Sequence, residues 1–302
     1  MSEICVRINE YTDPGCPWAY SAEPFRRRLN WLYEGRIEWV PRMVVLADTA
    51  DDYETRGFTP EWMAQSQRGF VRDHRMPMDT RVRARVAGTR DACRAVVAAR
   101  RHASERATRR LLRSLRVRHF GRELLDERAT IDRAAVDAGL DPQILRAWCA
   151  DPAVEEDLRA DMRAAREPLP AARVLDHKLA NWSGGRRYTC PSYEITRLED
   201  GVMISVPGFQ PFAAYDVVLA NLVPGLDRRE PPASVEAVLE WAGTPLASQE
   251  VAVVCDIDFL EARERLGRVA VEHHLGSDGF WTLPGATASS ADERAATVVA
   301  AA

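Results

Sequence analysis

Hydrophobic and polar residues alternate at the start of the chain in a pattern typical of strands. Residues 4–12 combine this alternation with β-branched side chains, and 36–45 has the same character, so both are predicted to be strands. Between them, 16–33 is predicted to form a helix that opens at Pro17. Pro24 should kink or divide that helix, because proline lacks the N–H that the helix interior needs. The chain therefore begins as a β-α-β unit.

The pattern changes to helices from about 58 to 170. Apolar residues recur at helical spacing over 90–118, and Asp-Pro pairs predict the starts of two further helices, at 142–149 and 152–166. This stretch is predicted to be an all-helical insertion.

Strand character returns at 192–197 and 202–206, where Asp200-Gly201 predicts a tight hairpin turn. A helix is expected next, at about 210–222. The order β-α-β, helical block, β-β-α predicts an α/β fold built on a split sheet with an inserted helical subdomain.

The rest of the chain is predicted to form a small second module. Residues 226–232 are charged, end in two prolines and are predicted to be a linker. Helices at about 234–242, 247–255 and 258–268 precede a hairpin, which is the layout of a winged helix over 226–285. The Ala/Ser/Thr-rich stretch 286–302 is predicted to be a disordered tail.

Composition indicates a globular protein of the cytoplasm. The chain has 302 residues, 46% of them hydrophobic, and a net charge of −4, so no global field would attract nucleic acid or an acidic membrane. We expect no signal peptide and no membrane span. The six cysteines form no CxxC motif and are expected to be reduced, separate thiols. No metal site is expected.

One basic region raises the question of an anionic ligand or nucleic acid. Residues 81–122 hold fourteen arginines against Asp91 and Glu105, a local net charge of +12. The arginines lack interleaved aromatic residues, so a solvated helical face offset by the acidic stretch 151–162 is favoured. The expected recognition helix of the winged-helix-like module, 259–266, mixes acids and bases, and packing or dimerisation is favoured there over DNA binding.

Cys16 is the first candidate for chemistry, because it lies at a strand-to-helix turn. Unpaired backbone N–H groups and the helix dipole at that position favour thiolate over thiol. The alternative is a small buried residue on the inner face of the helix. Position alone leaves these two readings balanced.

The segment Tyr11–Tyr20, YTDPGCPWAY, resembles the active-site segment of DsbA-like thioredoxin-fold proteins, and most closely the cytoplasmic FrnE-type branch. The resemblance extends over about 3–224 and implies a thioredoxin-like domain at 1–225 with a helical insertion at about 58–170. It also implies that Cys16 is the catalytic nucleophile.

The family has a cis-proline beside its catalytic cysteine, at the start of the third strand. Pro191 fits this position better than Pro207, because a strand, a hairpin and a final helix follow it. The resemblance implies that Thr189 and Pro191, together with Pro17 and Trp18, line a substrate groove. The alternative is an ordinary trans proline at a strand start.

Ala19 departs from the family pattern, since FrnE-type proteins have their second, resolving cysteine at this position. Without a cysteine at position 19, three alternatives for the mechanism remain open. A low-molecular-weight thiol such as glutathione could resolve a mixed disulfide on Cys16, Cys190 could supply the second thiol, or redox turnover has been lost. We rank the small-thiol route first.

The sequence thus predicts a cytoplasmic thiol-disulfide oxidoreductase that acts through a single cysteine, without a tightly bound cofactor. Its partners would be disulfide-containing proteins or small thiols, and a homodimer is a further option. The alternatives are a redox-inactive binding or adaptor protein, a small-thiol-dependent transferase or isomerase of the kappa-class type, and a DNA-associated redox sensor.

Overall fold

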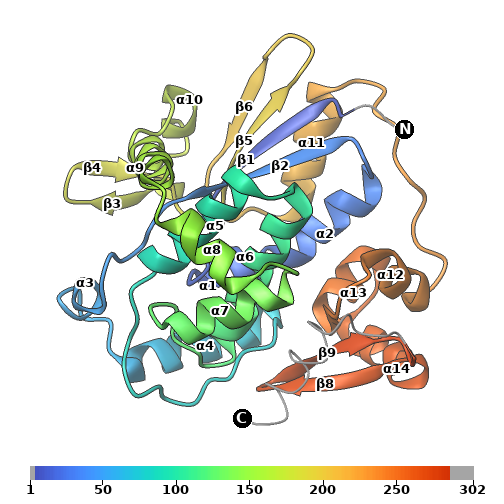
Figure 1. Cartoon of the computed structure of the whole chain (residues 1–302). Helices are drawn as coiled ribbons and strands as arrows, with labels where there is room; N and C mark the ends of the chain where they lie inside the picture. The colour runs from blue at the N-terminus through green and yellow to red at the C-terminus, as the bar shows by residue number, and fades with distance from the viewer. Residues whose placement is uncertain (1–3, 286–302) are drawn as a thin grey trace.

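The computed structural model describes residues 4–285, which are organised around a four-stranded sheet (Figure 1). The strand order is β2-β1-β5-β6, with β1 and β2 parallel and the other neighbours antiparallel. The strands are β1 (Val6–Thr12), β2 (Ile37–Met43), β5 (Ser192–Arg197) and β6 (Met203–Val206). All four lie where the sequence predicts strands, and β5 and β6 form the predicted hairpin.

The predicted first helix is divided as Pro24 suggests. α1 (Pro17–Ser21) ends at Ala22, and α2 (Glu23–Leu32) begins there with Pro24 in its first turn. Together with α11 (Phe212–Leu222), α2 packs against the sheet in a core that includes Val6 and Ile8. This β-α-β plus β-β-α arrangement is the thioredoxin-like fold that the sequence predicts.

The helical insertion lies between β2 and β5 and covers one side of the molecule (Figure 1). Its helices are α3 (Ala50–Glu54), α4 (Pro60–His74), α5 (Arg90–His102), α6 (Glu105–Phe120), α7 (Arg128–Asp137), α8 (Pro142–Cys149), α9 (Pro152–Arg166) and α10 (Pro170–Arg173), followed by the 3-10 turn Asp176–Lys178. A short hairpin, β3 (Ala180–Trp182) and β4 (Gly185–Arg187), then leads toward β5. The sequence missed α3 and this hairpin. α5 and α9 pack against β2.

The C-terminal part has the predicted three helices and hairpin. They are α12 (Val235–Ala242), α13 (Ser248–Cys255), α14 (Phe259–Val269), β8 (Val271–Leu275) and β9 (Asp278–Thr282). A two-residue strand that the sequence missed, β7 (Leu246–Ala247), completes a small sheet of order β7-β9-β8. The winged-helix assignment and the domain boundary near 225 remain predictions. The tail prediction for 286–302 lies outside the described residues.

A buried group of charged residues joins the sheet, the insertion and the C-terminal part. We call Glu10, Glu23, Arg113, Arg116 and Glu250 the ion cluster. Arg116 of α6 binds Glu10 at 3.0 Å and also pairs with Glu23, while Arg113 binds Glu250 of α13 at 2.6 Å. Because these residues come from β1, α2, α6 and α13, the cluster fastens the three parts together.

Candidate functional site

Cys16 is the N-cap residue of α1, at the end of the turn that follows β1. Pro17 occupies the first helical position, and the Tyr20 amide donates to the Cys16 carbonyl at 3.0 Å. The turn is closed by Asp13, whose carboxylate accepts from the Gly15 amide at 2.7 Å. Proline is favoured at this position because its missing N–H would have no helical partner. The sequence motif therefore fixes Cys16 at the start of the helix.

Cys190 faces Cys16 from the segment that enters β5. β1 and β5 are antiparallel neighbours, with Tyr11 opposite Ser192, so the end of one strand lies beside the start of the other. The Cys16 Sγ lies 3.5 Å from the Cys190 carbonyl oxygen. The Cys190–Pro191 peptide bond is cis, which confirms the prediction made for Pro191. We call Cys16, Cys190 and Asp13 the thiol site.

The two thiols have opposite pKa shifts. A side-chain hydrogen bond from Cys190 lowers the pKa of Cys16, and the Ala19 and Trp18 backbone amides lower it further, against burial and the charge of Asp13. Burial raises the pKa of Cys190 well above its usual value, and its interaction with Cys16 raises it further. Cys16 is therefore the thiolate-forming partner of the pair.

Asp13 is a residue of the site that the sequence indicated only as part of a turn. It is fully buried, and its Oδ2 accepts from the Leu46 amide at 2.9 Å and the Thr89 hydroxyl at 2.8 Å. The Cys93 thiol also donates to Oδ2, at 3.5 Å. Burial raises the pKa of the Asp13 carboxyl despite these donors. Its burial depends on α5 and the loop after β2, which no local pattern records.

Aromatic side chains form one rim of the site. Trp18 is 45% exposed and contacts Phe70, His74 and Phe209, with ring centroids 4.8–5.3 Å apart. Burial lowers the pKa of His74, so its ring is neutral at neutral pH. The rim offers a partly apolar surface next to Cys16.

Pro17, Thr189 and Pro191 lie close to Cys16 and Cys190 in the sequence, and their role in binding substrate stays a prediction. Pro17 and Thr189 are half-buried, Pro191 is buried, and the Thr189 hydroxyl donates to the Lys178 carbonyl at 2.7 Å. Tyr53 of α3, which the sequence did not single out, is close enough for the charges of Asp13 and Cys16 to raise its pKa, after the larger effect of burial. The thiol site thus lies between the end of β1, the start of α1 and the segment that enters β5.

The other cysteines do not join this pair. All six are free thiols. Cys93 is fully buried as predicted, whereas Cys5, Cys149 and Cys255 are half-buried and less core-like than the sequence suggested. Within residues 4–285 no group of three or more His, Cys, Asp or Glu side chains could hold a metal ion.

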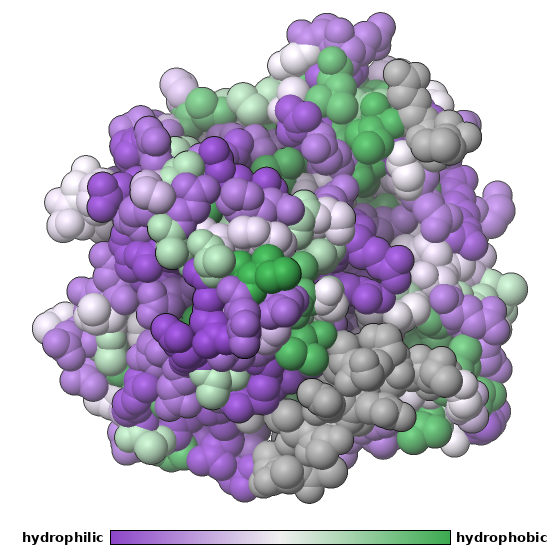
Figure 2. Space-filling model, in the orientation of Figure 1, coloured by the Kyte–Doolittle hydropathy of each residue, from purple (hydrophilic) through white to green (hydrophobic). Residues whose placement is uncertain are grey.

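The arginine-rich region is neutralised by acids from a neighbouring helix. Arg90 and Arg94 of α5 both bind Glu155 of α9, at 2.5 and 3.0 Å, and Arg101 binds Asp157 at 2.8 Å. This pairing confirms that acids of 151–162 offset the charge of α5, whereas the predicted solvated face is wrong for α6, where Arg116 and Arg118 are buried. The surface over these helices is accordingly mostly hydrophilic (Figure 2).

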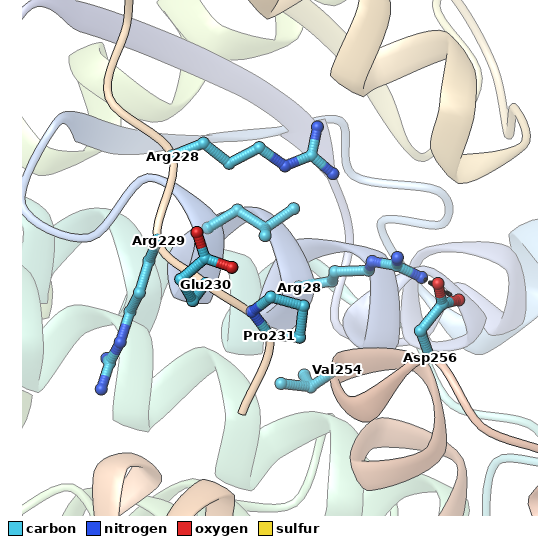
Figure 3. A pocket seen from close by; sticks show the side chains of 8 residues that line it. Arg28, Arg228, Arg229, Glu230, Pro231, Val254 and Asp256 are labelled. Atoms are coloured by element: carbon cyan, nitrogen blue, oxygen red, sulfur yellow. Dashed lines mark hydrogen bonds and ion pairs between the residues drawn. The ribbon is translucent and has the colours of Figure 1, made fainter. Parts of the chain in front are cut away.

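A second hollow lies where the segment after α11 crosses α2 and the end of α13 (Figure 3). Arg28, Arg228 and Arg229 are among the residues that line it, and each has an acidic partner, as Arg28 does in Asp256 at 2.7 Å. No cysteine lines this hollow, which separates it from the thiol site. Among the described residues, the structure has no helix with the length and apolar character needed to cross a membrane.

Two solved structures have a fold similar to that of this chain. A candidate protein disulfide isomerase from Nitrosomonas europaea aligns with 72% of this chain and 97% of its own, with a TM-score of 0.53 and 16% identity. A probable DsbA oxidoreductase from Streptomyces coelicolor aligns with 75% of this chain and 100% of its own, with a TM-score of 0.51 and 20% identity. No protein-family model and no curated protein sequence matches. The chain therefore has the thioredoxin-like fold of DsbA-type proteins.

Proposed function

We propose that the chain is a thiol-disulfide oxidoreductase with Cys16 as the attacking thiol. The observation that carries this proposal is the position of the Cys16 sulfur, at the N-cap of α1 and 3.5 Å from the carbonyl oxygen of Cys190, where the Cys190 side chain and two backbone amides lower its pKa. The thiolate is the nucleophile in disulfide exchange, so these donors favour the reactive form. The fold shared with DsbA-type structures supports the same chemistry.

In the first step, the Cys16 thiolate attacks a disulfide. A bond forms between Cys16 and one substrate sulfur, the substrate disulfide breaks, and the other sulfur leaves as a thiolate. Ala19 has no thiol with which to release the resulting mixed disulfide. We therefore propose that a low-molecular-weight thiol such as glutathione supplies the electrons that return Cys16 to its reduced form. No tightly bound cofactor is required.

Pro17, Trp18, Thr189 and Pro191 would hold the substrate beside Cys16. The exposed face of Trp18 suits an apolar group next to the substrate sulfur. Substrates would be disulfide-containing proteins or mixed disulfides of small thiols. We propose the cytoplasm as the compartment, because small thiols are kept reduced there.

Turnover of hydroxyethyl disulfide with glutathione tests this proposal. Cys16→Ser should lower the rate at least about 100-fold, because the hydroxyl is far less nucleophilic than a thiolate at neutral pH. Cys149→Ser is the matched control, since burial raises the pKa of that thiol to about 11, and it should retain the wild-type rate. Wild-type turnover by Cys16→Ser would overturn the enzyme proposal in favour of a binding or adaptor role.

A further inference from the structure

Two cysteines that are 174 positions apart in the sequence converge at one end of the sheet. β1 delivers Cys16 and β5 begins just after Cys190, and the pairing of Tyr11 with Ser192 holds the two segments together. The Cys16 Sγ lies 3.5 Å from the Cys190 carbonyl oxygen, and the two thiols are close enough for each to shift the pKa of the other. A disulfide between them requires their Cα atoms to lie within about 7 Å of each other.

We propose that Cys190 is a second catalytic thiol, which releases substrate from Cys16 by forming an internal Cys16–Cys190 disulfide. This inference rests on the proposed function and replaces its direct release step. The small thiol then reduces the internal disulfide instead of attacking the mixed disulfide.

The release of substrate by Cys190 balances in atoms and electrons, with the small thiol of the proposed function as the final reductant. The Cys190 sulfur forms a bond to the Cys16 sulfur, and the bond between Cys16 and the substrate sulfur breaks. The substrate leaves as a thiolate and takes up the proton that Cys190 gives up, so Cys190 is oxidised and the substrate sulfur is reduced. Two molecules of the small thiol then reduce the internal disulfide and become a disulfide themselves.

The buried position of Cys190 suits this role. Both thiols are buried, with Cys190 4% and Cys16 6% exposed, but the pKa of Cys190 is raised whereas that of Cys16 is lowered, so Cys190 does not compete with Cys16 as the attacking thiolate. Once Cys16 is in a mixed disulfide, its negative charge is gone, so that charge no longer raises the pKa of Cys190, although burial still does. The second thiol therefore becomes easier to ionise at the stage where it is needed.

Cys93 is the other buried thiol near the site, and its contacts set it apart. Its sulfur donates to Asp13 Oδ2 at 3.5 Å, and the structure gives it no hydrogen bond to Cys16. Burial and the adjacent Asp13 charge raise its pKa well above the usual value. Disulfide mapping can therefore distinguish the proposed pair from a pair that includes Cys93.

The test starts from reduced protein mixed with glutathione disulfide, followed by acid quenching, mass measurement and disulfide mapping. Wild-type protein should pass to the Cys16–Cys190 disulfide, while Cys190→Ser should hold glutathione on Cys16. An internal thiol acts at an effective concentration on the order of mM. With about 0.1 mM reduced glutathione, we therefore expect the adduct to last at least about tenfold longer in Cys190→Ser.

Two further variants make the outcome decisive. Cys190→Ala should trap the same adduct, which guards against a specific effect of serine. Adding Ala19→Cys to Cys190→Ser should shorten the adduct lifetime again, because Ala19 lies in the same turn and its amide already approaches the Cys16 sulfur.

Equal adduct lifetimes in wild type and Cys190→Ser, or mapping of Cys16 to Cys93, would overturn the role of Cys190. Failure of the proposed function gives a different result, in which no glutathione is attached to Cys16 and Cys16→Ser keeps wild-type turnover. The two failures are therefore distinguishable.

Discussion

Strand β1 and the turn after it contribute carboxylates to two buried polar regions, the ion cluster and the thiol site, and the carboxylates have different kinds of partner in each. In the ion cluster, the carboxylates of Glu10 and Glu23 pair with the Arg116 guanidinium, and nearby arginines hold the pKa of Glu23 far below its usual value despite burial. In the thiol site, the Asp13 carboxylate is bound by amide, hydroxyl and thiol donors, and burial raises its pKa. One region has cations for its acids, and the other has neutral donors.

This difference separates a structural role from a chemical one. Paired charges in the ion cluster are fixed by their partners and leave little to react. At the thiol site, ionisation of Cys16 depends on a few hydrogen bonds balanced against burial and against Asp13. Burial of an ionisable group therefore does not identify a functional site in this protein, whereas donors that lower the pKa of a buried thiol do.

The largest effect should come from breaking the ion cluster. Arg116→Met leaves Glu10 and Glu23 buried without their central cation, and we expect the free energy of unfolding to fall by about 3–5 kcal/mol. Urea denaturation measures this change. Arg268→Met removes an exposed pair with Glu264 on α14 and should change stability by less than about 1 kcal/mol. A similar small loss for Arg116→Met would mean that the cluster is not what fastens the parts.

Glu23→Gln should lower the free energy of unfolding by less than Arg116→Met does, and the size of this loss should depend on pH. The variant should lose about 2–3 kcal/mol at neutral pH, because a charge-assisted hydrogen bond and its pairings disappear. The pKa of Glu23 is lowered by folding, so its contribution is complete above the unfolded value of about 4.3 and is lost as pH falls below it. The difference from wild type in urea denaturation should therefore shrink in acid. A difference that stays constant with pH would contradict the ionised role of Glu23.

Asp13→Asn should show the opposite pH dependence. The pKa of Asp13 is raised by folding, so its charge costs stability above the folded pKa, and this cost disappears as pH falls toward the unfolded value of about 3.9. Asparagine carries no charge and so removes this cost. It also loses one hydrogen bond of the carboxylate, which lowers the free energy of unfolding by about 1 kcal/mol. Relative to wild type, the variant should therefore gain stability as pH rises. A parallel trend for Asp13→Asn and Glu23→Gln would remove the contrast between the two regions.

Local sequence signals predicted the framework well, because they act over a few residues. The Asp141 and Asp151 side chains cap α8 and α9 at the predicted starts, and Pro24 marks the division between α1 and α2. The sequence missed β7, with two residues, and the β3–β4 hairpin, because such short strands carry no readable alternation.

Long-range contacts explain why the sequence indicated the cysteines of the thiol site but not the ion cluster. The resemblance around Cys16 and Pro191 predicts that both thiols lie beside one groove. The partnership of Arg116 with Glu10, 106 positions apart, is recorded in no local pattern, and arginine in a basic helix usually indicates a solvated face. The sequence therefore indicated the candidate thiols, but not the ion cluster or the burial of Asp13.

The smallest expected effect is a change in the pKa of Cys16, which tests whether the Asp13 charge acts on that thiol. The Asp13 charge raises the pKa of Cys16, so Asp13→Asn should lower the pKa of Cys16. The pH dependence of Cys16 alkylation by iodoacetamide, followed by mass spectrometry, measures this pKa. Glu23→Gln is the control and should leave it unchanged, because arginines neutralise the Glu23 charge. A higher Cys16 pKa in Asp13→Asn would show that Asp13 acts by positioning the turn, since the loss of its charge alone can only lower that pKa.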